Sequence, residues 1–350
     1  MTAAAWFVTG GTGYLGRLVL PGLVREGPVL ALTRRPQGAG ILEGVTWLQG
    51  NLDAPGPWLA RLAEVPLKGI LHIGAHVAHT RKDGNRAVRD QVAAVTGLAN
   101  LARQRGLRMV FISSSGTVGC SVRPEDAPDD DAPHVAAVVA RWPYYRGKVE
   151  AERAALRLLA EGPGQLVVLR PPMLIGPGDT LGRSTSTLRR YLSGRLPFLI
   201  RGGIHVADIR DVADAVLAAC RIDHPKSAYN LPGHAEALMP FLKRCERLCG
   251  VPAPRRHVPW PVAWLAASAS SWLASRTGRH PWLPDPVVIE MGRHHWGLAG
   301  SAAPVDLGYS PRPVDETLTE TLAWLRQDMA LDDSPTPLGP SPSTLNRESA

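Results

Sequence analysis

The feature that most constrains this chain of 350 residues is a glycine-rich turn near its N-terminus. An apolar run at residues 6–9 predicts a strand, and Thr9-Gly10-Gly11-Thr12-Gly13-Tyr14-Leu15-Gly16 follows it and opens a helical stretch. Gly10 permits a sharp turn, Gly13 lets a pyrophosphate approach the helix N-terminus, and Gly16 permits close packing of helix on strand. Strand, turn and helix in this order predict a dinucleotide-binding unit.

The rest of the first half alternates short apolar runs with helical stretches. Such alternation is typical of an α/β fold in which helices cover both faces of a parallel sheet. We therefore predict a Rossmann-type, doubly wound parallel sheet with a smaller C-terminal substrate lobe. Ligands in such sheets bind at the carboxyl ends of the strands. The further predicted strands are 29–33, 46–49, 69–73, 109–113 and 166–170.

After residue 176 the regular alternation of apolar runs and helical stretches ends, which suggests a change of domain. We predict an NAD(P)-binding domain over 1–176, with 204–232 as candidates to complete its sheet, and a mainly helical substrate lobe over 177–330. Residues 331–350 have the composition of a disordered tail. The Trp-bearing segment 258–275 is too short and proline-rich to span a bilayer, so we expect it to pack in the lobe. Peripheral membrane contact is the alternative.

Composition excludes several other functions. The net charge of +8 suggests a nucleic-acid partner, but only five of the 39 basic residues are lysine and the arginines form no long run. We predict no nucleic-acid partner. The cysteines Cys245 and Cys249 lack a third ligand at metal-binding spacing, so we predict free thiols and no metal. The first eight residues lack a secretory signal, which favours the cytoplasm.

The end of the second predicted strand selects between the two nicotinamide cofactors. A carboxylate there would bind the ribose hydroxyls of NAD, whereas arginine accommodates the 2′-phosphate of NADP. The chain has Thr33-Arg34-Arg35-Pro36 and no acid. Because a guanidinium forms charge-assisted hydrogen bonds with phosphate, we predict NADP, with NAD as the alternative.

A serine, tyrosine and lysine set predicts redox chemistry at the same edge of the sheet. Tyr144 and Lys148 are four residues apart on a predicted helix, so they share one face. A nearby ammonium stabilises a phenolate and lowers the tyrosine pKa toward neutrality. The run 113–115 places serines at the end of an apolar strand, where a hydroxyl can hydrogen-bond a substrate carbonyl.

Taken together, these motifs resemble the extended short-chain dehydrogenase/reductase family, also described as NAD-dependent epimerase/dehydratase-like. The resemblance covers roughly residues 5–326 and is nearest the dihydroflavonol-reductase and 3β-hydroxysteroid-dehydrogenase branch. The matching segments, in family order, are 9–16, 72–75, 110–119, 144–152, 170–179, 208–213 and 307–311.

The resemblance implies a role for each matching residue. Ser114 would be the catalytic serine, with Ser115 as the alternative, Tyr144 the general acid/base and Lys148 the group that lowers its pKa and holds the nicotinamide ribose. Asn51 and Leu52 would flank the adenine, Gly74 and Ala75 the adjoining ribose, and Pro171 the nicotinamide. The cofactor-binding set is then Gly10, Thr12, Gly13, Tyr14, Leu15, Gly16, Arg34, Arg35, Asn51, Leu52, Gly74, Ala75, Lys148 and Pro171.

Two departures from the family pattern bear on this interpretation. Gln91 stands where the family has an asparagine, which puts that structural contact in doubt. Thr117-Val118-Gly119 stands where Val-Tyr-Gly is usual, which weakens the analogy to sugar-nucleotide enzymes.

Three functions are compatible with these residues. The favoured one is an NADP-dependent reductase or dehydrogenase of a hydrophobic ketone or secondary alcohol, because the stretch 172–175 is apolar. The second is a nucleotide-sugar epimerase or dehydratase with tightly bound NAD, and the third a non-catalytic dinucleotide sensor. The sequence does not specify the substrate itself, because a fold does not fix its function. For the oligomeric state, we expect a homodimer.

Overall fold

Seven parallel strands form the centre of the computed structural model, which describes residues 3–38, 40, 42–75, 84–196, 198–278 and 281–332. Their order is β3-β2-β1-β4-β5-β6-β9, which confirms the predicted doubly wound sheet. The six strands predicted in the first half are found with ends shifted by at most two residues. The strands are β1 (Ala5–Thr9), β2 (Val29–Thr33), β3 (Val45–Gln49), β4 (Leu67–His72), β5 (Arg108–Ile112), β6 (Gln165–Arg170) and β9 (Ala228–Asn230).

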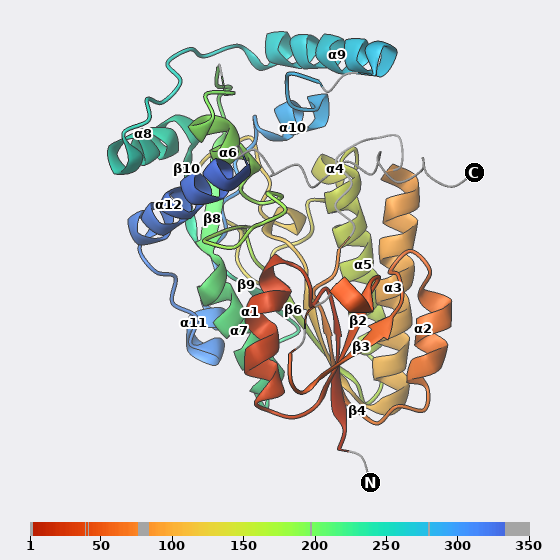
Figure 1. The fold of residues 1–350 in the computed structure, drawn as a ribbon. Coiled ribbons are helices and arrows are strands. Elements are labelled where there is room, and N and C mark those ends of the chain that lie inside the picture. The colour runs from red at the N-terminus through yellow and green to blue at the C-terminus, as the bar shows by residue number, and fades with distance from the viewer. Residues whose placement is uncertain are drawn as a thin grey trace, which may run out of the picture.

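Helices bury both faces of this sheet (Figure 1). One face is covered by α1 (Tyr14–Val24) and α7 (Ile209–Arg221), and the other by α2 (Pro55–Leu62), α3 (Gly84–Arg105) and α5 (Pro143–Leu159). Successive strand residues point to opposite faces, so Val8 packs toward α1 while Phe7 stacks on Trp58 with ring centroids 5.7 Å apart. Burial on both sides explains why the central strands are largely apolar, whereas the edge strand β3 is partly exposed.

A second, three-stranded sheet lies beside the carboxyl edge of the first. It has the order β10-β8-β7 and consists of β7 (Met173–Ile175), β8 (Gly203–Asp208) and β10 (His234–Ala237). The short strands of this second sheet were not predicted, because they gave no clear alternation in the sequence. Of the segment 204–232, only β9 joins the main sheet, whereas β8 belongs to the second one. The boundary at residue 176 stays a prediction.

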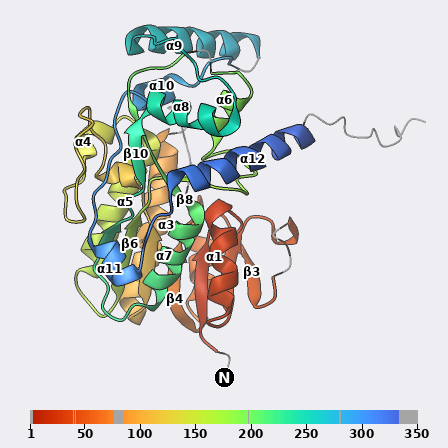
Figure 2. The ribbon, with the colours of Figure 1, turned by 90° about the vertical axis from the view of Figure 1, so that its left-hand side faces the viewer.

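Helices α6 (Ser186–Leu192), α8 (Leu238–Cys249) and α12 (Val314–Asp332) share a core with the second sheet. Helices α9 (Trp260–Thr277) and α10 (Pro286–Met291) lie at the outer end of this lobe, and α11 (Ala302–Leu307) returns to α7 (Figures 1 and 2). The predicted tail begins inside α12, and residues 333–350 lie outside the described residues. Within the described chain, no helix has the length and apolarity needed to cross a membrane.

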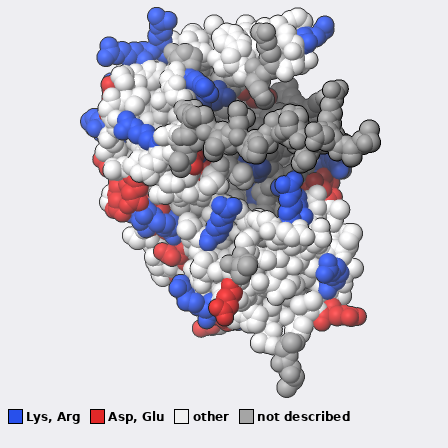
Figure 3. Space-filling model, in the orientation of Figure 1, with Lys and Arg blue, Asp and Glu red and all other residues white. Residues whose placement is uncertain are grey.

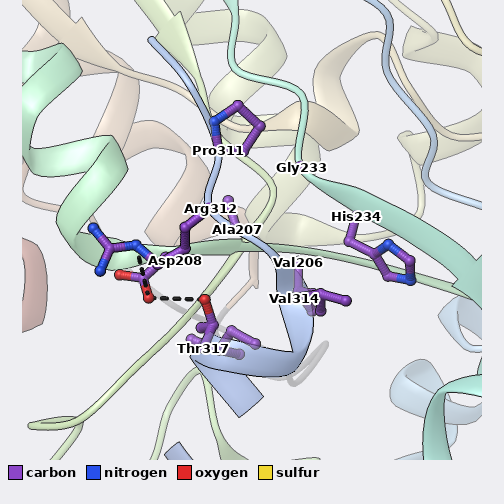
Figure 4. Close-up of a pocket in the computed structure, with 10 residues that line it drawn as sticks. Val206, Ala207, Asp208, Gly233, His234, Pro311, Arg312, Val314 and Thr317 are labelled. Carbon is purple, nitrogen blue, oxygen red and sulfur yellow. Dashed lines mark hydrogen bonds and ion pairs between the residues drawn. The ribbon is translucent and has the colours of Figure 1, made fainter. Parts of the chain in front are cut away.

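A group of charged side chains joins the two sheets to the C-terminal segment. Asp208 accepts a hydrogen bond from the Arg210 backbone N–H (2.8 Å) at the start of α7 and another from the Thr317 hydroxyl (2.9 Å). Arg312 donates to Asp211 at 2.6 Å. Figure 4 shows Asp208, Arg312 and Thr317 converging around a small pocket that Gly233 also lines. The segment 208–213 thus has a structural role, since its carboxylates hold Arg312 and Thr317 of the C-terminal part of the chain.

Candidate active site

The glycine turn is packed too tightly to accept side chains at its first and last glycines. Gly10 has a φ of +77°, and a Cβ there would lie 2.5 Å from the backbone N of Gly74, at the end of β4. A Cβ on Gly16 would lie 2.2 Å from the carbonyl oxygen of Gly10. The turn therefore lies directly against the carboxyl end of β4, where the fold binds its ligand.

Helix α1 begins behind this turn with its N-terminal N–H groups uncapped. Gly13 is the N-cap, provides no side-chain cap, and no acidic residue lies in the first turn. Such an end attracts a phosphate through its N–H groups and its dipole. Thr12 and Leu15 flank this end, while the Tyr14 hydroxyl donates a 2.7 Å hydrogen bond to the Gly176 carbonyl. These features fit a dinucleotide pyrophosphate.

The residues predicted to bind the adenosine end lie along the same edge. Arg34 and Arg35 follow β2 and are exposed, and within the described chain neither side chain has a hydrogen-bond or ion-pair partner. Asn51 follows β3, and its amide donates to Asp53 at 3.2 Å. Leu52 packs against Gly74, since a Cβ on Gly74 would lie 2.7 Å from the Leu52 Cδ1. Ala75 comes next and is half-buried.

A buried histidine supports the glycine turn from the neighbouring strand. His72 is bonded to the Thr9 hydroxyl at 2.8 Å, and the same hydroxyl accepts from the Gly74 N–H at 3.2 Å. Gln91 reaches the other His72 ring nitrogen at 3.5 Å. Burial, with the nearby Lys148 charge, lowers the His72 pKa to about 3, so the ring is neutral. The glutamine that replaces the family's asparagine therefore makes a structural contact of its own.

The three serines after β5 have different surroundings. The Ser113 hydroxyl donates to Glu152 at 2.6 Å, and Ser115 is buried with its backbone N–H donating to the Pro171 carbonyl at 2.8 Å. Ser114 is half-buried and is hydrogen-bonded to the hydroxyl of Tyr144. Only Ser114 of the three is placed next to the tyrosine predicted to handle the proton.

Tyr144 lies in the first turn of α5, so its hydroxyl faces the end of β5. Burial raises its pKa to about 12, although the hydrogen bond from Ser114 lowers it. This direction is opposite to the one the catalytic role needs. The lowering of the Tyr144 pKa by Lys148 therefore stays a prediction for the enzyme with its cofactor bound.

Lys148 lies one turn further along α5 and is buried. Its ammonium donates to the Ile112 carbonyl at 2.6 Å and lies 4.9 Å from the centre of the Phe111 ring. Burial lowers the Lys148 pKa to about 7, while the charge of Glu152 raises it. A lysine with a pKa this close to neutrality is typical of a functional site rather than of a surface.

A buried carboxylate behind the serines was given no role in the sequence analysis. Glu152 accepts from Arg170 at 2.5 Å and from Ser113, and its Oε1 lies 2.9 Å from Nε2 of His134. Burial alone would raise its pKa, but His134 and Arg170 outweigh that effect and hold the pKa at about 2. The signal that could have identified it is the four-residue spacing from Lys148, which puts both on one helix face.

Aromatic side chains from distant segments adjoin the Ser114–Tyr144 pair. Tyr145 makes an edge contact with Tyr144 and stacks on Trp296, with ring centroids 5.0 Å apart in both cases. Gly116 makes the approach of Tyr145 possible, because a Cβ there would lie 2.2 Å from its ring. Trp142 packs edge-on to His294 at 4.9 Å. This aromatic cluster (Trp142, Tyr145, His294 and Trp296) gives the site a flat apolar side.

Comparison with known proteins agrees with this arrangement. The family model described as "NAD dependent epimerase/dehydratase family" matches residues 6–231. The chain is 26% identical over 335 residues to a Synechocystis protein named "Putative dihydroflavonol 4-reductase", covering 93% of this chain and 95% of that protein.

Solved structures agree at the level of the fold. The crystal structure of gox2253 has a TM-score of 0.75 and 24% identity, with 93% of this chain and 98% of that one covered. MoeE5 in complex with UDP-glucose and NAD has a TM-score of 0.67 and 20% identity, with coverage of 93% and 100%.

Proposed function

This chain belongs to the NAD-dependent epimerase/dehydratase family, and on that premise we propose that it moves a hydride between NADP(H) and a hydrophobic ketone or secondary alcohol. The observation that carries the proposal is the hydrogen bond between Ser114 and Tyr144 at the carboxyl edge of the sheet. A carbonyl oxygen placed between the two hydroxyls would receive a hydrogen bond from each.

In the proposed reaction the cofactor would supply a hydride and the protein a proton. The bound dinucleotide supplies the hydride that reaches the carbonyl carbon. Tyr144 donates its proton to the oxygen as the negative charge develops there, and Ser114 polarises the same oxygen. Lys148, one turn away on α5, stabilises the phenolate that Tyr144 becomes. In the oxidation direction Tyr144 takes the proton back.

The choice of NADP rests on the end of β2. Arg34 and Arg35 are the only charged side chains of the segment 33–38, and both extend into solvent. A 2′-phosphate is the partner that suits two adjacent guanidinium groups, whereas ribose hydroxyls need an acceptor. NAD is the alternative cofactor, because the similar structure of MoeE5 is a complex with NAD.

The choice of a hydrophobic substrate rests on the aromatic cluster and on β7. Pro171 and Pro172 are buried behind Ser115, and Met173 and Leu174 follow on a short strand. These side chains offer apolar surface and no hydrogen-bond donor for a substrate phosphate. The Synechocystis relative named as a reductase favours the same class. MoeE5 in complex with UDP-glucose favours the second candidate, a nucleotide-sugar enzyme.

The proposal is tested by turnover of the purified chain with NADPH or NADH and three substrate classes: aromatic ketones, steroid ketones and UDP-sugars. We expect NADPH consumption with a hydrophobic ketone. In Tyr144→Phe, kcat should fall by at least ~10²-fold, the usual contribution of a positioned general acid, while NADPH binding is retained. The kcat of Ser114→Ala should also fall, and by more than the kcat of Ser115→Ala. Near-full activity in Tyr144→Phe, or turnover restricted to UDP-sugars, would refute the assignment.

A further inference from the structure

Helix α9 presents an apolar face to the outside of the molecule. Val262, Leu265, Ala269 and Trp272 recur at three- and four-residue spacing and are exposed, as is Leu273 beside them. Leu265 is 62% exposed and Trp272 59%. Soluble proteins rarely keep such a contiguous apolar surface unless it meets a partner.

The opposite face of α9 is held by packing, so the outward orientation is fixed. Ala263 and Ala267 are buried against Ile289 of α10. The Ser270 hydroxyl accepts hydrogen bonds from the backbone N–H groups of Trp282 (3.2 Å) and Leu283 (3.3 Å). These bonds hold the backbone of Trp282 beside α9, and the Trp282 side chain, which is 72% exposed, adds a second exposed tryptophan to this end of the lobe.

The charged residues of α9 and of the segment that leads into it are all basic. No Asp or Glu occurs between Glu246 and Asp285. Arg255 and Arg256 are exposed just before α9, and the Arg276 guanidinium lies 5.2 Å over the ring of Trp272. In Figure 3, the part of the molecule that Figure 1 assigns to α9 is white between basic side chains at either end. A partner for this surface must be apolar and negatively charged.

We propose that this outward face of α9, together with Trp282 and the flanking arginines, binds the surface of an anionic membrane. Tryptophan is favoured at the boundary between headgroups and acyl chains, leucine inserts just below it, and arginine pairs with anionic headgroups. The helix lies in the plane of the interface and does not cross it. A second copy of this chain is a poorer partner, because a symmetric contact would bring the arginines together without carboxylates to pair with them.

The position of this surface suits the hydrophobic substrate proposed above, although membrane binding does not depend on that function. Helix α10 packs against α9 through Ile289 and against the aromatic cluster through Val287. Helix α10 therefore lies between α9 and the aromatic cluster, so the proposed membrane-binding surface and the aromatic side of the candidate active site are in the same part of the molecule.

The test is sedimentation of the full chain with lipid vesicles, at low and high salt. We expect binding to vesicles of phosphatidylcholine mixed with phosphatidylglycerol, weaker binding to pure phosphatidylcholine, and weakening by salt. Tryptophan fluorescence should shift to the blue on binding. Equal binding to neutral vesicles, or no binding to either, would overturn the proposal. Self-association through α9, seen by light scattering and abolished by Leu265→Glu, would also overturn it.

Exposed positions allow variants that leave the core intact. Leu265→Glu and Trp272→Glu should each weaken vesicle binding at least ~10-fold, since an inserted side chain is lost and a repelling charge gained. Arg255→Gln with Arg256→Gln should weaken it by about 5-fold for each charge removed. Val305→Glu is the matched control, because Val305 is 82% exposed on α11, away from this surface. An equal loss of binding in Val305→Glu would contradict the assignment to α9.

Discussion

The Ser113 hydroxyl donates a 2.6 Å hydrogen bond to Oε2 of Glu152, which joins the serine run at the end of β5 to the helix that carries Tyr144 and Lys148. Arg170, at the end of β6, donates to the other oxygen of the same carboxylate. The two strands and α5 are therefore fixed relative to one another at the point where the reaction is proposed to occur. The Ser113 hydroxyl proton is engaged by Glu152, so Ser113 acts here as a positioning residue.

Glu152→Gln should destabilise the protein strongly, because it leaves the Arg170 guanidinium buried without its counter-ion. We expect the free energy of unfolding to fall by about 3–5 kcal/mol, measured by urea denaturation. Glu150→Gln is the control on the same helix, since Glu150 is half-exposed and lies 3.7 Å from Arg146; it should cost less than ~1 kcal/mol. Equal stability of the two variants would contradict a buried ion pair.

Gly16→Ala should be destabilising and should also weaken dinucleotide binding. The added Cβ would lie 2.2 Å from the Gly10 carbonyl oxygen, so the turn must move away from the start of α1. We expect a loss of about 1–3 kcal/mol, typical of overpacking, and a higher Kd for NADPH by fluorescence titration. Gly56→Ala is the control, because apart from its chain neighbours nothing lies within 4 Å of its Cβ; since Pro57 follows, no gain is expected, and stability should change by less than ~1 kcal/mol with NADPH binding unchanged. Unchanged NADPH binding in Gly16→Ala would contradict the proposed site.

Arg34→Gln with Arg35→Gln should change the preference between cofactors. The loss of a charge-assisted hydrogen bond to a 2′-phosphate raises the Kd for NADPH by about 10-fold or more, whereas the Kd for NADH stays nearly constant. Arg61→Gln, an exposed arginine on α2, should leave both Kd values unchanged. Parallel weakening of NADPH and NADH would show that these arginines do not recognise the 2′-phosphate.

The buried Lys148 should make stability depend on pH in a defined window. Burial lowers its pKa from 10.5 to about 7, so between these values the unfolded chain binds more protons than the folded one. The free energy of unfolding therefore rises with pH from 7 to about 10, by up to ~1 kcal/mol per pH unit. Lys148→Met removes the titrating amine. In urea denaturation at pH values from 7 to 10, the free energy of unfolding of the wild type should therefore rise relative to that of the variant. Parallel curves would contradict a lysine that titrates near neutrality.

The sequence predicted the first six strands of the main sheet well because each is a short, largely apolar run between helical stretches or turns. It did not reveal β7 and β8, which are short, lie about 30 residues apart and pair only with each other and with β10. Hydrophobic patterns indicate that a segment is buried, and not which distant segment it pairs with.

The candidate site divides in the same way. Gly10, Gly16 and Tyr144 could be proposed from sequence because each belongs to a motif of fixed local spacing, 9–16 or 144–148. The stacking of Trp296 on Tyr145 does not, since the two are 151 residues apart and no spacing rule relates them. The roles of the three serines could also not be separated from sequence, because their differences come from Glu152, Pro171 and Tyr144 on other elements.

Strand β9 completes the first sheet, and helix α7 covers one of its faces. Both come later in the chain than β7 and β8, which belong to the second sheet. Gly22 of α1 packs so closely on α7 that a Cβ would lie 2.4 Å from Leu217. A fragment ending at residue 176 would leave this face of α1 bare and the edge of β6 open to pairing with another chain. The chain up to residue 176 therefore depends on later elements both for the last strand of its sheet and for the cover of α1.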